Sequence, residues 1–209
     1  NRISNAFENV IPNSGSLMLD IPLVNLVGKL DGIGLSVQLS YSMGTPGRLG
    51  LPDNWSFDVP FLTPGEALEV NGKRYIIDPS WTDATGYASG LKYENNHGIA
   101  FVDNISGQPL PYGESGASYQ FTFSDTDGSC HYFDSTGKLL MRADRHSNFI
   151  AYAYTDDNLL DTITDSFGQQ TTFGYNPNQI IITCPDGRTT TLEFTSTGKL
   201  MFMARDCSP

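Results

Sequence analysis

Apolar and polar residues alternate along much of the chain, and glycine-rich segments separate the alternating stretches. In "GIGLSVQLSYSMG" every second residue from Leu35 to Tyr41 falls on one face, and "SLMLDIPLVNLVG" alternates in a similar way. A period of two is typical of a strand with one buried face, because successive side chains point to opposite sides. Helical spacing is weak throughout, and its best candidate is a single turn at Pro64–Val70. The pattern therefore predicts an all-β fold.

The clearest single hairpin is predicted in "ALEVNGKRYIID". Asn71 and Gly72 both tolerate positive φ angles, which a tight two-residue turn between antiparallel strands requires. Further along, "NISGQPLPYGESGAS" has the composition of a loop. We place a boundary there, between a non-repeating β lead-in region, residues 1–118, and a repeating region, residues 119–209.

The second region repeats itself. Asp144, Asp165 and Asp186 recur every 21 residues, and Asp206 continues the series after a further 20 residues. Each of the first three is expected to start a turn, and the eighth residue after each is aromatic. Self-similarity at a fixed period predicts a repeat architecture with one hairpin per unit. The residues that define the repeat are its turn aspartates and strand aromatics, namely Asp144, Asp165, Asp186, Phe133, Tyr152, Tyr154, Phe173, Tyr175 and Phe194.

An earlier copy of the unit lies in "DGSCHYFDSTGKLLMRAD". It shares the string F-x-S-T-G-K-L with "FTSTGKL", which aligns Gly137 with Gly198, and together the copies make about four tandem hairpins. A lone hairpin is marginally stable in water, so the units are expected to pair edge to edge into one continuous antiparallel sheet, capped by the lead-in region. The aromatics of the four units are then expected to form one cross-strand row: Phe133, Tyr152, Phe173 and Phe194.

Composition indicates a folded chain and narrows the choice of partners. Of the 209 residues, 39% are hydrophobic and 11% are aromatic, which is enough for a sizeable core. The net charge of −11 disfavours a nucleic-acid partner, since phosphate binding needs clustered lysine and arginine. No apolar run approaches the roughly 20 residues of a membrane span. Cys130, Cys184 and Cys207 are too scattered for a disulfide framework or a zinc site, and one disulfide remains open.

The run "NFIAYAYTDDNLLDTITDSFGQQTTFGY" resembles the unit of the RHS/YD-repeat family, which reads approximately G-x-x-x-x-Y-x-Y-D-x-x-G-x-L-x-x-x-x-D-x-x-G. Asn158 stands where that unit has its middle glycine, and the tyrosine-aspartate dipeptide itself does not occur. The lead-in segment "GLPDNWSFDVPFL" is also similar to a tryptophan-containing segment of these proteins. The residues that match the unit are Tyr152, Tyr154, Leu160, Asp165 and Gly168.

The resemblance implies a strand-rich shell wound from many such units. In bacterial toxins of the polymorphic and insecticidal kinds this shell encloses a C-terminal toxic segment, and related cell-surface proteins use it for adhesion. By this resemblance we expect a structural module that is secreted or displayed at the cell surface of a bacterium. Its partners would be the remainder of the same polypeptide, meaning further repeats and a C-terminal cargo. Four units are fewer than a closed shell takes, so we expect an N-terminal piece of a longer protein.

No catalytic or metal-binding motif stands out in the sequence. The histidines His97, His131 and His146 lie in unrelated contexts, and nucleophile-elbow, zinc-protease and phosphate-loop motifs are absent. The segment "DTDGS" lacks the glutamate that a calcium loop carries at its twelfth position. We therefore expect no enzyme activity, no cofactor and no metal.

Aromatic side chains outside the repeat suggest a second hypothesis. Exposed aromatic faces are one means by which proteins hold sugars, and these residues lie mostly in loops, where binding residues tend to occur. A packing role explains the same residues, so both interpretations stay open. The alternative function is a carbohydrate-binding or adhesive cell-surface module whose partner is a cell-surface glycan. The candidate ligand contacts are Trp55, Trp81, Tyr87 and Tyr112.

Overall fold

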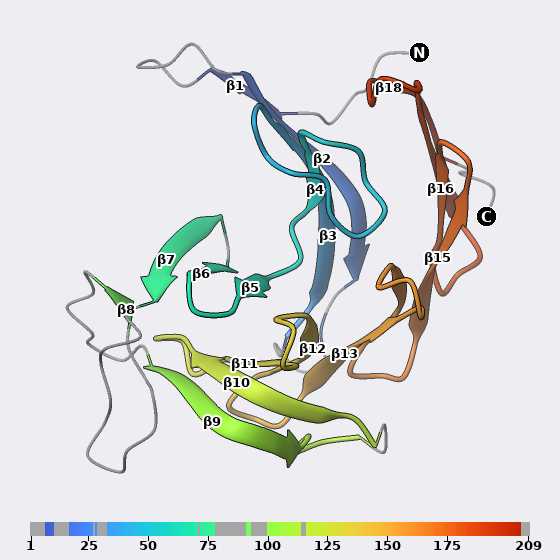
Figure 1. Cartoon of the computed structure of the whole chain (residues 1–209). Helices are drawn as coiled ribbons and strands as arrows, with labels where there is room; N and C mark the ends of the chain where they lie inside the picture. Colours follow the sequence, from blue (N-terminus) through green and yellow to red (C-terminus); the bar gives the residue numbers. More distant parts are fainter. Residues whose placement is uncertain are drawn as a thin grey trace. The chain divides into compact units, whose positions relative to one another are not determined.

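The computed structural model describes residues 7–10, 17–26, 28, 33–70, 72–77, 91–92, 100–113 and 116–205. The regular secondary structure of these residues consists of β-strands alone (Figure 1), which confirms the all-β class. The strands, in chain order, are β1 (Phe7–Val10), β2 (Leu17–Leu26), β3 (Leu35–Ser42), β4 (Trp55–Phe57), β5 (Phe61–Thr63), β6 (Ala67–Val70), β7 (Lys73–Ile77), β8 (Leu91–Lys92), β9 (Ala100–Pro109), β10 (Ser118–Ser124), β11 (Cys130–Phe133), β12 (Leu139–Ala143), β13 (Phe149–Tyr154), β14 (Leu160–Thr164), β15 (Gln170–Asn176), β16 (Gln179–Thr183), β17 (Thr189–Phe194) and β18 (Leu200–Arg205).

The described strands form three sheets. Strands β1 to β4 make one four-stranded sheet, β5 to β8 make another, and β9 to β18 follow one another in chain order in a ten-stranded sheet. Strands β11 to β18 are four consecutive hairpins, so the expected antiparallel hairpin sheet is confirmed. The lead-in region also contributes β9, which pairs with β10 as an edge strand of this sheet.

Two local predictions can be compared with the structure. The hairpin expected at Gly72 is present: Val70 pairs with Lys73 across a two-residue turn, and Gly72 has a φ of +72°. Its other turn residue, Asn71, lies outside the described residues. The helical turn expected at residues 64–70 is wrong. Residues 64–66 form a tight turn that joins β5 directly to β6, and the strand alternation resumes at once.

The chain divides into two compact units, each built from segments that are distant in sequence. Unit 1 comprises Asn1–Gly28, Gly34–Asp58 and Tyr152–Pro209, and unit 2 comprises Lys29–Ile33 and Val59–Ala151. Each unit combines part of the lead-in region with part of the repeat. The predicted boundary at residue 118 divides non-repeating from repeating sequence, which is a different division from that between the compact units. It therefore stays a prediction.

Unit 1 has a core between two β layers. The sheet of β1 to β4 supplies one layer, and β15 to β17 supply the other. Two ring pairs join the layers in edge-to-face geometry: Phe57 lies 5.6 Å from Phe173, and Trp55 lies 5.9 Å from Phe194, measured between ring centroids. Such a pair contributes about 0.5–1.5 kcal/mol beyond the burial of its area. Leu39, at the middle of β3, is fully buried in this core.

Unit 2 repeats this arrangement with its own sheets. The small sheet of β5 to β8 packs on β10, where the ring of Tyr75 lies 5.4 Å from that of Phe123, and it contacts the β11–β12 turn through a bridge between Phe61 and Lys138. Leu62, Leu68 and Phe133 are completely buried in the core of this unit. In both units, therefore, a small lead-in sheet covers one face of the hairpin strands.

Candidate functional site

Seven of the eight turns that join β10 to β18 share one hydrogen-bonding pattern. The N–H of the first turn residue donates to the carbonyl of the residue four positions later, and the N–H three positions later donates back to the first carbonyl. This is a type I turn followed by a residue with positive φ, which joins strands through a three-residue loop. The first residues are Asp125, Asp134, Asp144, Thr155, Asp165, Cys184 and Thr195. The residues with positive φ are Gly128, Gly137, Ser147, Asn158, Gly168, Gly187 and Gly198.

Sequence reasoning found only some of these turns, because it followed the aspartates. Thr155, Cys184 and Thr195 occupy the same first position as the aspartates do elsewhere. The signal that locates them is the glycine or asparagine three positions later, since these residues adopt positive φ most readily.

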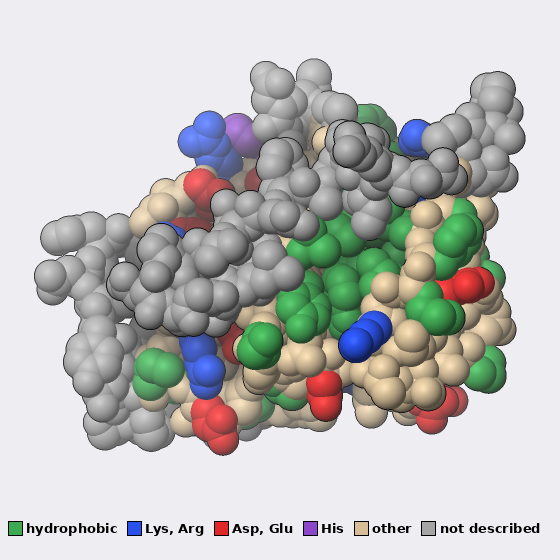
Figure 2. Space-filling view, turned by 90° about the horizontal axis from the view of Figure 1, so that it is seen from above, with side chains coloured by type: hydrophobic (Ala, Val, Ile, Leu, Met, Phe, Trp, Pro, Cys, Tyr) green, Lys and Arg blue, Asp and Glu red, His purple; other side chains and the backbone are tan. Residues whose placement is uncertain are grey.

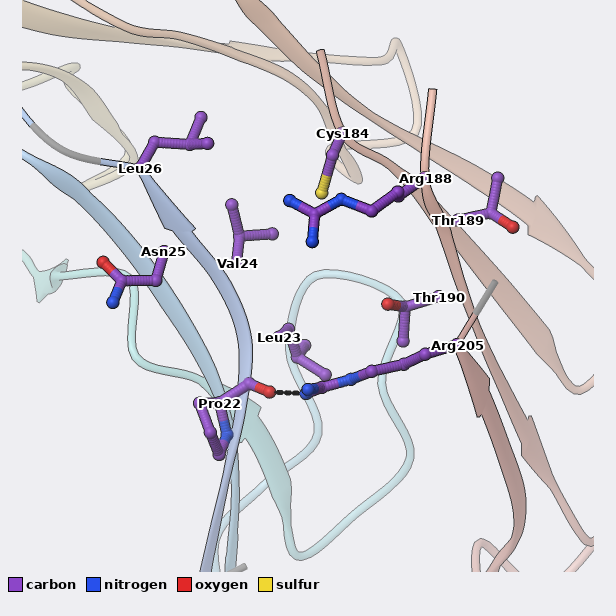
Figure 3. A pocket seen from close by; sticks show the side chains of 10 residues that line it. All are labelled: Pro22, Leu23, Val24, Asn25, Leu26, Cys184, Arg188, Thr189, Thr190 and Arg205. Atoms are coloured by element: carbon purple, nitrogen blue, oxygen red, sulfur yellow. Dashed lines mark hydrogen bonds between the residues drawn. The ribbon is translucent and has the colours of Figure 1, made fainter. Parts of the chain in front are cut away.

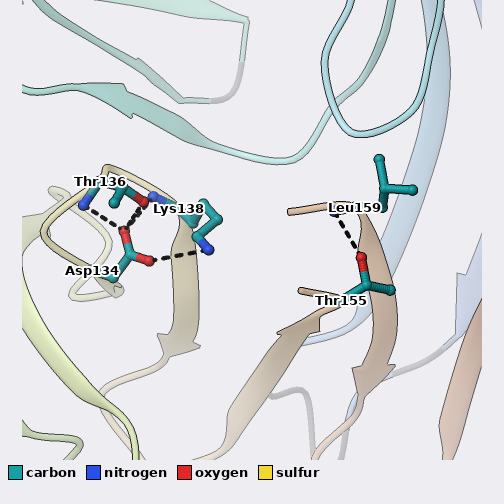
Figure 4. A network of polar contacts seen from close by, with 5 residues as sticks. All are labelled: Asp134, Thr136, Lys138, Thr155 and Leu159. Carbon is teal, nitrogen blue, oxygen red and sulfur yellow. Dashed lines mark hydrogen bonds and ion pairs between the residues drawn. The ribbon is translucent and has the colours of Figure 1, made fainter. Parts of the chain in front are cut away.

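The side chain at the first position accepts hydrogen bonds from the turn backbone (Figure 4). Asp134 Oδ1 accepts from the N–H groups of Thr136 at 2.8 Å and Lys138 at 3.0 Å, and Lys138 Nζ lies 3.6 Å from Oδ2. A hydroxyl serves in another turn, where Leu159 N–H donates to Thr155 Oγ1 at 3.2 Å. The first position thus needs a short side chain with an acceptor oxygen in these turns.

Two of the three spaced aspartates start their turns as expected. Oδ1 of Asp144 and of Asp165 accepts from the N–H groups two and four positions later, at 2.8 and 2.9 Å. Asp186 differs, because Cys184 is the first residue of its turn. Asp186 instead accepts from the N–H of Arg188 at 3.1 Å and pairs with its Nε at 2.6 Å. The prediction that Asp186 starts a turn is therefore wrong.

The same offset changes the expected aromatic row. Phe173 lies directly opposite Ile182 on β16, and Ile182 lies opposite Thr190 on β17. Phe194 is four residues further along β17, so Phe173 and Phe194 belong to different cross-strand rows. Counted from the first residue of its turn, Phe194 takes the position of Tyr175. The single row is wrong because equal sequence intervals do not preserve the register between strands.

The repeat aromatics still contribute most of their area to packing. Tyr152 and Tyr154 are half-buried. The Tyr175 hydroxyl lies 2.8 Å from the carbonyl oxygen of Leu160 and 3.2 Å from that of Leu49, so it links a lead-in loop to the repeat. Burial, with a smaller effect of nearby Asp161, raises the pKa of Tyr175. The repeat aromatics that are at most 4% exposed are Phe133, Phe173 and Phe194.

The shared string F-x-S-T-G-K-L marks two equivalent contacts with the lead-in region. In unit 2, Leu62 N–H donates to the Gly137 carbonyl at 3.0 Å. In unit 1, Trp55 Nε1 donates to the Gly198 carbonyl at 2.9 Å. Both hairpins also carry a register shift at the phenylalanine that opens the string. A Cβ on Gly198 would lie 2.9 Å from Pro52 Cβ, so only glycine allows the lead-in loop to pack this closely on the turn.

Two of the four candidate ligand contacts lie in the described part of the chain. Trp55 is 5% exposed and has its ring against Phe194, so it is a packing residue and its face is closed to a ligand. Tyr112 is half-buried and stacks on Phe149 at 5.9 Å with an interplanar angle of 7°. The two candidates outside the described residues are Trp81 and Tyr87.

Hydrogen bonds lower the pKa of two aspartates in the turns. Burial of Asp144 opposes its ionisation, but hydrogen bonds from Asn148, His146 and Ile33 outweigh that effect and lower the pKa of this carboxyl. The pKa of Asp186 is also lowered, first by the backbone hydrogen bond from Arg188. Both carboxylates therefore stay charged to a lower pH than a free aspartate.

His131 is the one histidine in the described residues that is buried. Its imidazole is fully enclosed, with the ring of Phe123 at 5.7 Å and that of Phe133 at 6.5 Å. Burial, and then the charge of Arg142, lowers its pKa to about 4. A neutral, enclosed imidazole cannot reach a substrate, which argues against a role for His131 in acid–base catalysis.

The described residues contain no group of three or more His, Cys, Asp or Glu side chains that could hold a metal ion. Cys130 and Cys184 are free thiols, and burial, together with Asp186, raises the pKa of Cys184. Within the same residues, no helix has the length and apolar character needed to cross a membrane.

No family model matches the chain, and no curated protein matches it either.

Proposed function

We propose that the chain is a structural, non-enzymatic module of an RHS/YD-repeat type polypeptide from a bacterium, secreted or held at the cell surface. In this proposal its hairpins form part of a β wall that encloses or displays a C-terminal, toxin-like segment. The partner is the remainder of the same polypeptide, first of all a further hairpin unit that pairs with β18.

The observation that carries the proposal is the edge of the ten-stranded sheet. β18 is its last strand, after nine strands that pair in chain order. Met201 and Phe202 on β18 are 64% and 49% exposed. Natural proteins protect open edge strands with lysine, proline or a covering element, because such edges attract other strands. The stretch "LMFMA" of β18 contains no lysine or proline, although the strand ends at Arg205 and has a register shift at Met201 relative to β17. An apolar edge strand of this kind suits pairing with another strand of the same polypeptide.

The surface in Figure 2 is consistent with such a wall. Hydrophobic side chains gather in one area of this face, whereas acidic and basic side chains are scattered around it. Exposed apolar areas of appreciable size mark sites of contact with other protein segments.

The test is the reading frame that follows residue 209, together with the protein it encodes. We expect further units with an Asp or Thr three residues before a Gly or Asn, and a non-repeating C-terminal segment. A protein extended by the next unit should show slower amide hydrogen exchange in β18 than the 209-residue chain. A frame without further units, or unchanged exchange in β18, would contradict the proposal.

The carbohydrate-binding alternative has less support from the residues that suggested it. The face of Trp55 is closed, and that of Tyr112 is stacked on Phe149. A glycan array with the 209-residue chain tests this alternative directly. Specific binding of one glycan class, abolished by Tyr112→Ala, would favour it over the structural role.

A further inference from the structure

A pocket of about 420 Å³ lies within unit 1, between its two β layers (Figure 3). One wall is β2, from Pro22 to Leu26. The opposite wall comes from the β16–β17 turn, the start of β17 and the end of β18. No residue of this pocket takes part in the turn contacts or ring pairs that join the two layers elsewhere.

The two walls differ in chemistry. The β2 wall is largely apolar, and Leu23 and Val24 are 8% and 3% exposed. The opposite wall carries the guanidinium groups of Arg188 and Arg205, and both side chains extend across the pocket toward β2 (Figure 3). Arg205 Nη2 donates to the carbonyl of Pro22, which holds this guanidinium in place.

The pocket has an excess of positive charge in a strongly acidic protein. Two arginines and no carboxylate are found among its described lining residues, although the whole chain carries a net charge of −11. Asp186, beside the pocket, pairs with Arg188 through Nε at 2.6 Å, and this leaves the two terminal nitrogens of Arg188 toward the pocket. About one positive charge is therefore left uncompensated near the Cys184 thiol, where both guanidinium groups are close enough to lower its pKa against the larger effect of burial.

We propose that this pocket binds a carboxylate with an apolar body. The carboxylate lies between the guanidinium groups of Arg188 and Arg205, and its apolar part packs on Leu23 and Val24. Guanidinium groups suit this role, since their planar N–H donors match the two oxygens of a carboxylate. This inference goes beyond the proposed structural function and does not depend on it.

A monoanion fits the pocket better than a phosphate. One net positive charge balances one carboxylate, whereas a phosphate dianion would add repulsion from Asp186. Asn25 is the one residue of the β2 wall with a side-chain hydrogen-bond donor, and the other side chains of this wall are apolar, so the wall suits the apolar body of a ligand better than the oxygens of a phosphate. The carboxylate can come from a small organic acid or from the C-terminus of a peptide, and these two sources share the same recognition chemistry.

The experiment is an NMR titration of the 209-residue chain at low salt, followed through the backbone amides of Thr189 and Thr190. The probes are hexanoate, hexan-1-ol, inorganic phosphate, and a leucine-terminated tripeptide as its free acid and as its amide. We expect saturable shifts with hexanoate and the peptide acid, and at least tenfold weaker binding of the alcohol and the amide. Tighter binding of the peptide acid than of hexanoate would assign the site to a peptide terminus, and the reverse order to a small acid.

Variants separate the pocket from general charge effects. Arg188→Gln and Arg205→Gln should each weaken hexanoate binding about tenfold, the effect of losing one charge-assisted contact of about 1.4 kcal/mol. Arg145→Gln, at an exposed arginine in unit 2, should leave binding unchanged. The side chain of Arg188 is 54% exposed, so Arg188→Gln should keep the fold. If Arg205→Gln does not fold, the binding measured with Arg188→Gln is sufficient to test the proposal. Equal binding of hexan-1-ol, tighter binding of phosphate, absence of saturable shifts, or unchanged binding by Arg188→Gln would each overturn the proposal.

Discussion

Single glycines combine two demands in this protein. The fourth position of each repeat turn needs positive φ, and at some turns the neighbouring layer also comes too close for a side chain. Gly198 has a φ of +77° and lies under Pro52, whereas Gly187 has a φ of +84° and open space around it. These two positions therefore separate backbone strain from steric conflict.

We predict that Gly187→Ala lowers the free energy of unfolding by about 1–2 kcal/mol, the usual cost of a left-handed alanine. Gly198→Ala should lower the free energy of unfolding by about 1 kcal/mol more than Gly187→Ala. The new Cβ would also push Pro52 away and weaken the hydrogen bond from Trp55 Nε1 to the carbonyl of residue 198. Urea denaturation of both variants measures the difference. Equal losses would show that the contact with Pro52 is not tight.

The buried His131 predicts a specific pH dependence. Its pKa is lowered from 6.5 to about 4 in the folded chain, so the unfolded chain takes up the proton first as the pH falls. Stability should therefore decrease between about pH 6.5 and pH 4, by on the order of 3 kcal/mol in total from this group. Below that range the folded chain is protonated too, and the contribution of His131 becomes constant.

His131→Phe should remove this slope between pH 6.5 and 4, whereas replacement of the exposed His146 by Gln should keep it. The measurement is the urea midpoint at half-unit pH intervals for the three proteins. An identical slope in His131→Phe would mean that other groups cause the pH dependence. Asp144 acts in a separate range, because its lowered pKa removes stability only as the pH falls below the ordinary value of 3.8.

The hairpin turns depend on the acceptor at their first position more than on the spacing of aspartates. Asp165 is 6% exposed and accepts two backbone hydrogen bonds, whereas Asp186 is a third-position residue with a half-exposed side chain. We predict that Asp165→Ala costs about 1–3 kcal/mol, because two turn N–H groups lose their partner. Asp186→Ala should cost clearly less than Asp165→Ala, because the ion pair between Asp186 and Arg188 is exposed to solvent. Thermal unfolding measured for both variants would contradict this account if Asp186→Ala were the more damaging change.

Local chemistry explains which elements could be predicted from the sequence. Alternation from Leu35 to Tyr41 and the turn at Gly72 depend on neighbours a few residues apart, and both appear in the structure. The offset at Asp186 could not be predicted from the interval of 21 residues, because strand register depends on loop length. Asn176 pairs with Gln179 across a two-residue loop, where the other repeat connections have three-residue loops.

The candidate site was predicted less well, because it depends on how layers pack. Trp55 was a candidate ligand contact, yet its indole donates to Gly198, 143 residues away in sequence. The arginines of the pocket, Arg188 and Arg205, have no spacing that marks them as a pair. The F-x-S-T-G-K-L string was used only to align two copies of the repeat, and the structure shows that its glycines are where the lead-in region contacts the repeat.

For the chain as a whole, the open edge at β18 predicts self-association in the absence of a pairing strand. The double variant Met201→Lys/Phe202→Lys should shift the 209-residue chain toward the monomer, because edge lysines disfavour strand pairing. Sedimentation at several protein concentrations gives the measurement, and Met43→Lys, at another exposed methionine, is the matched control. A chain that is monomeric at high concentration would show that the β18 edge does not attract strands.

Because each unit is built from separate segments of the chain, the two units become able to fold at different times during synthesis. Unit 2 has all its segments once residue 151 is made, but the strands of unit 1 that end at Asp58 must wait for β14 to β18. At 5–20 residues per second, the roughly 100 intervening residues take about 5–20 s. During that time the apolar face of β3 on the nascent polypeptide has no cover from β15 and β17. A chaperone that holds the ribosome-bound N-terminal strands would therefore raise the yield of folded protein.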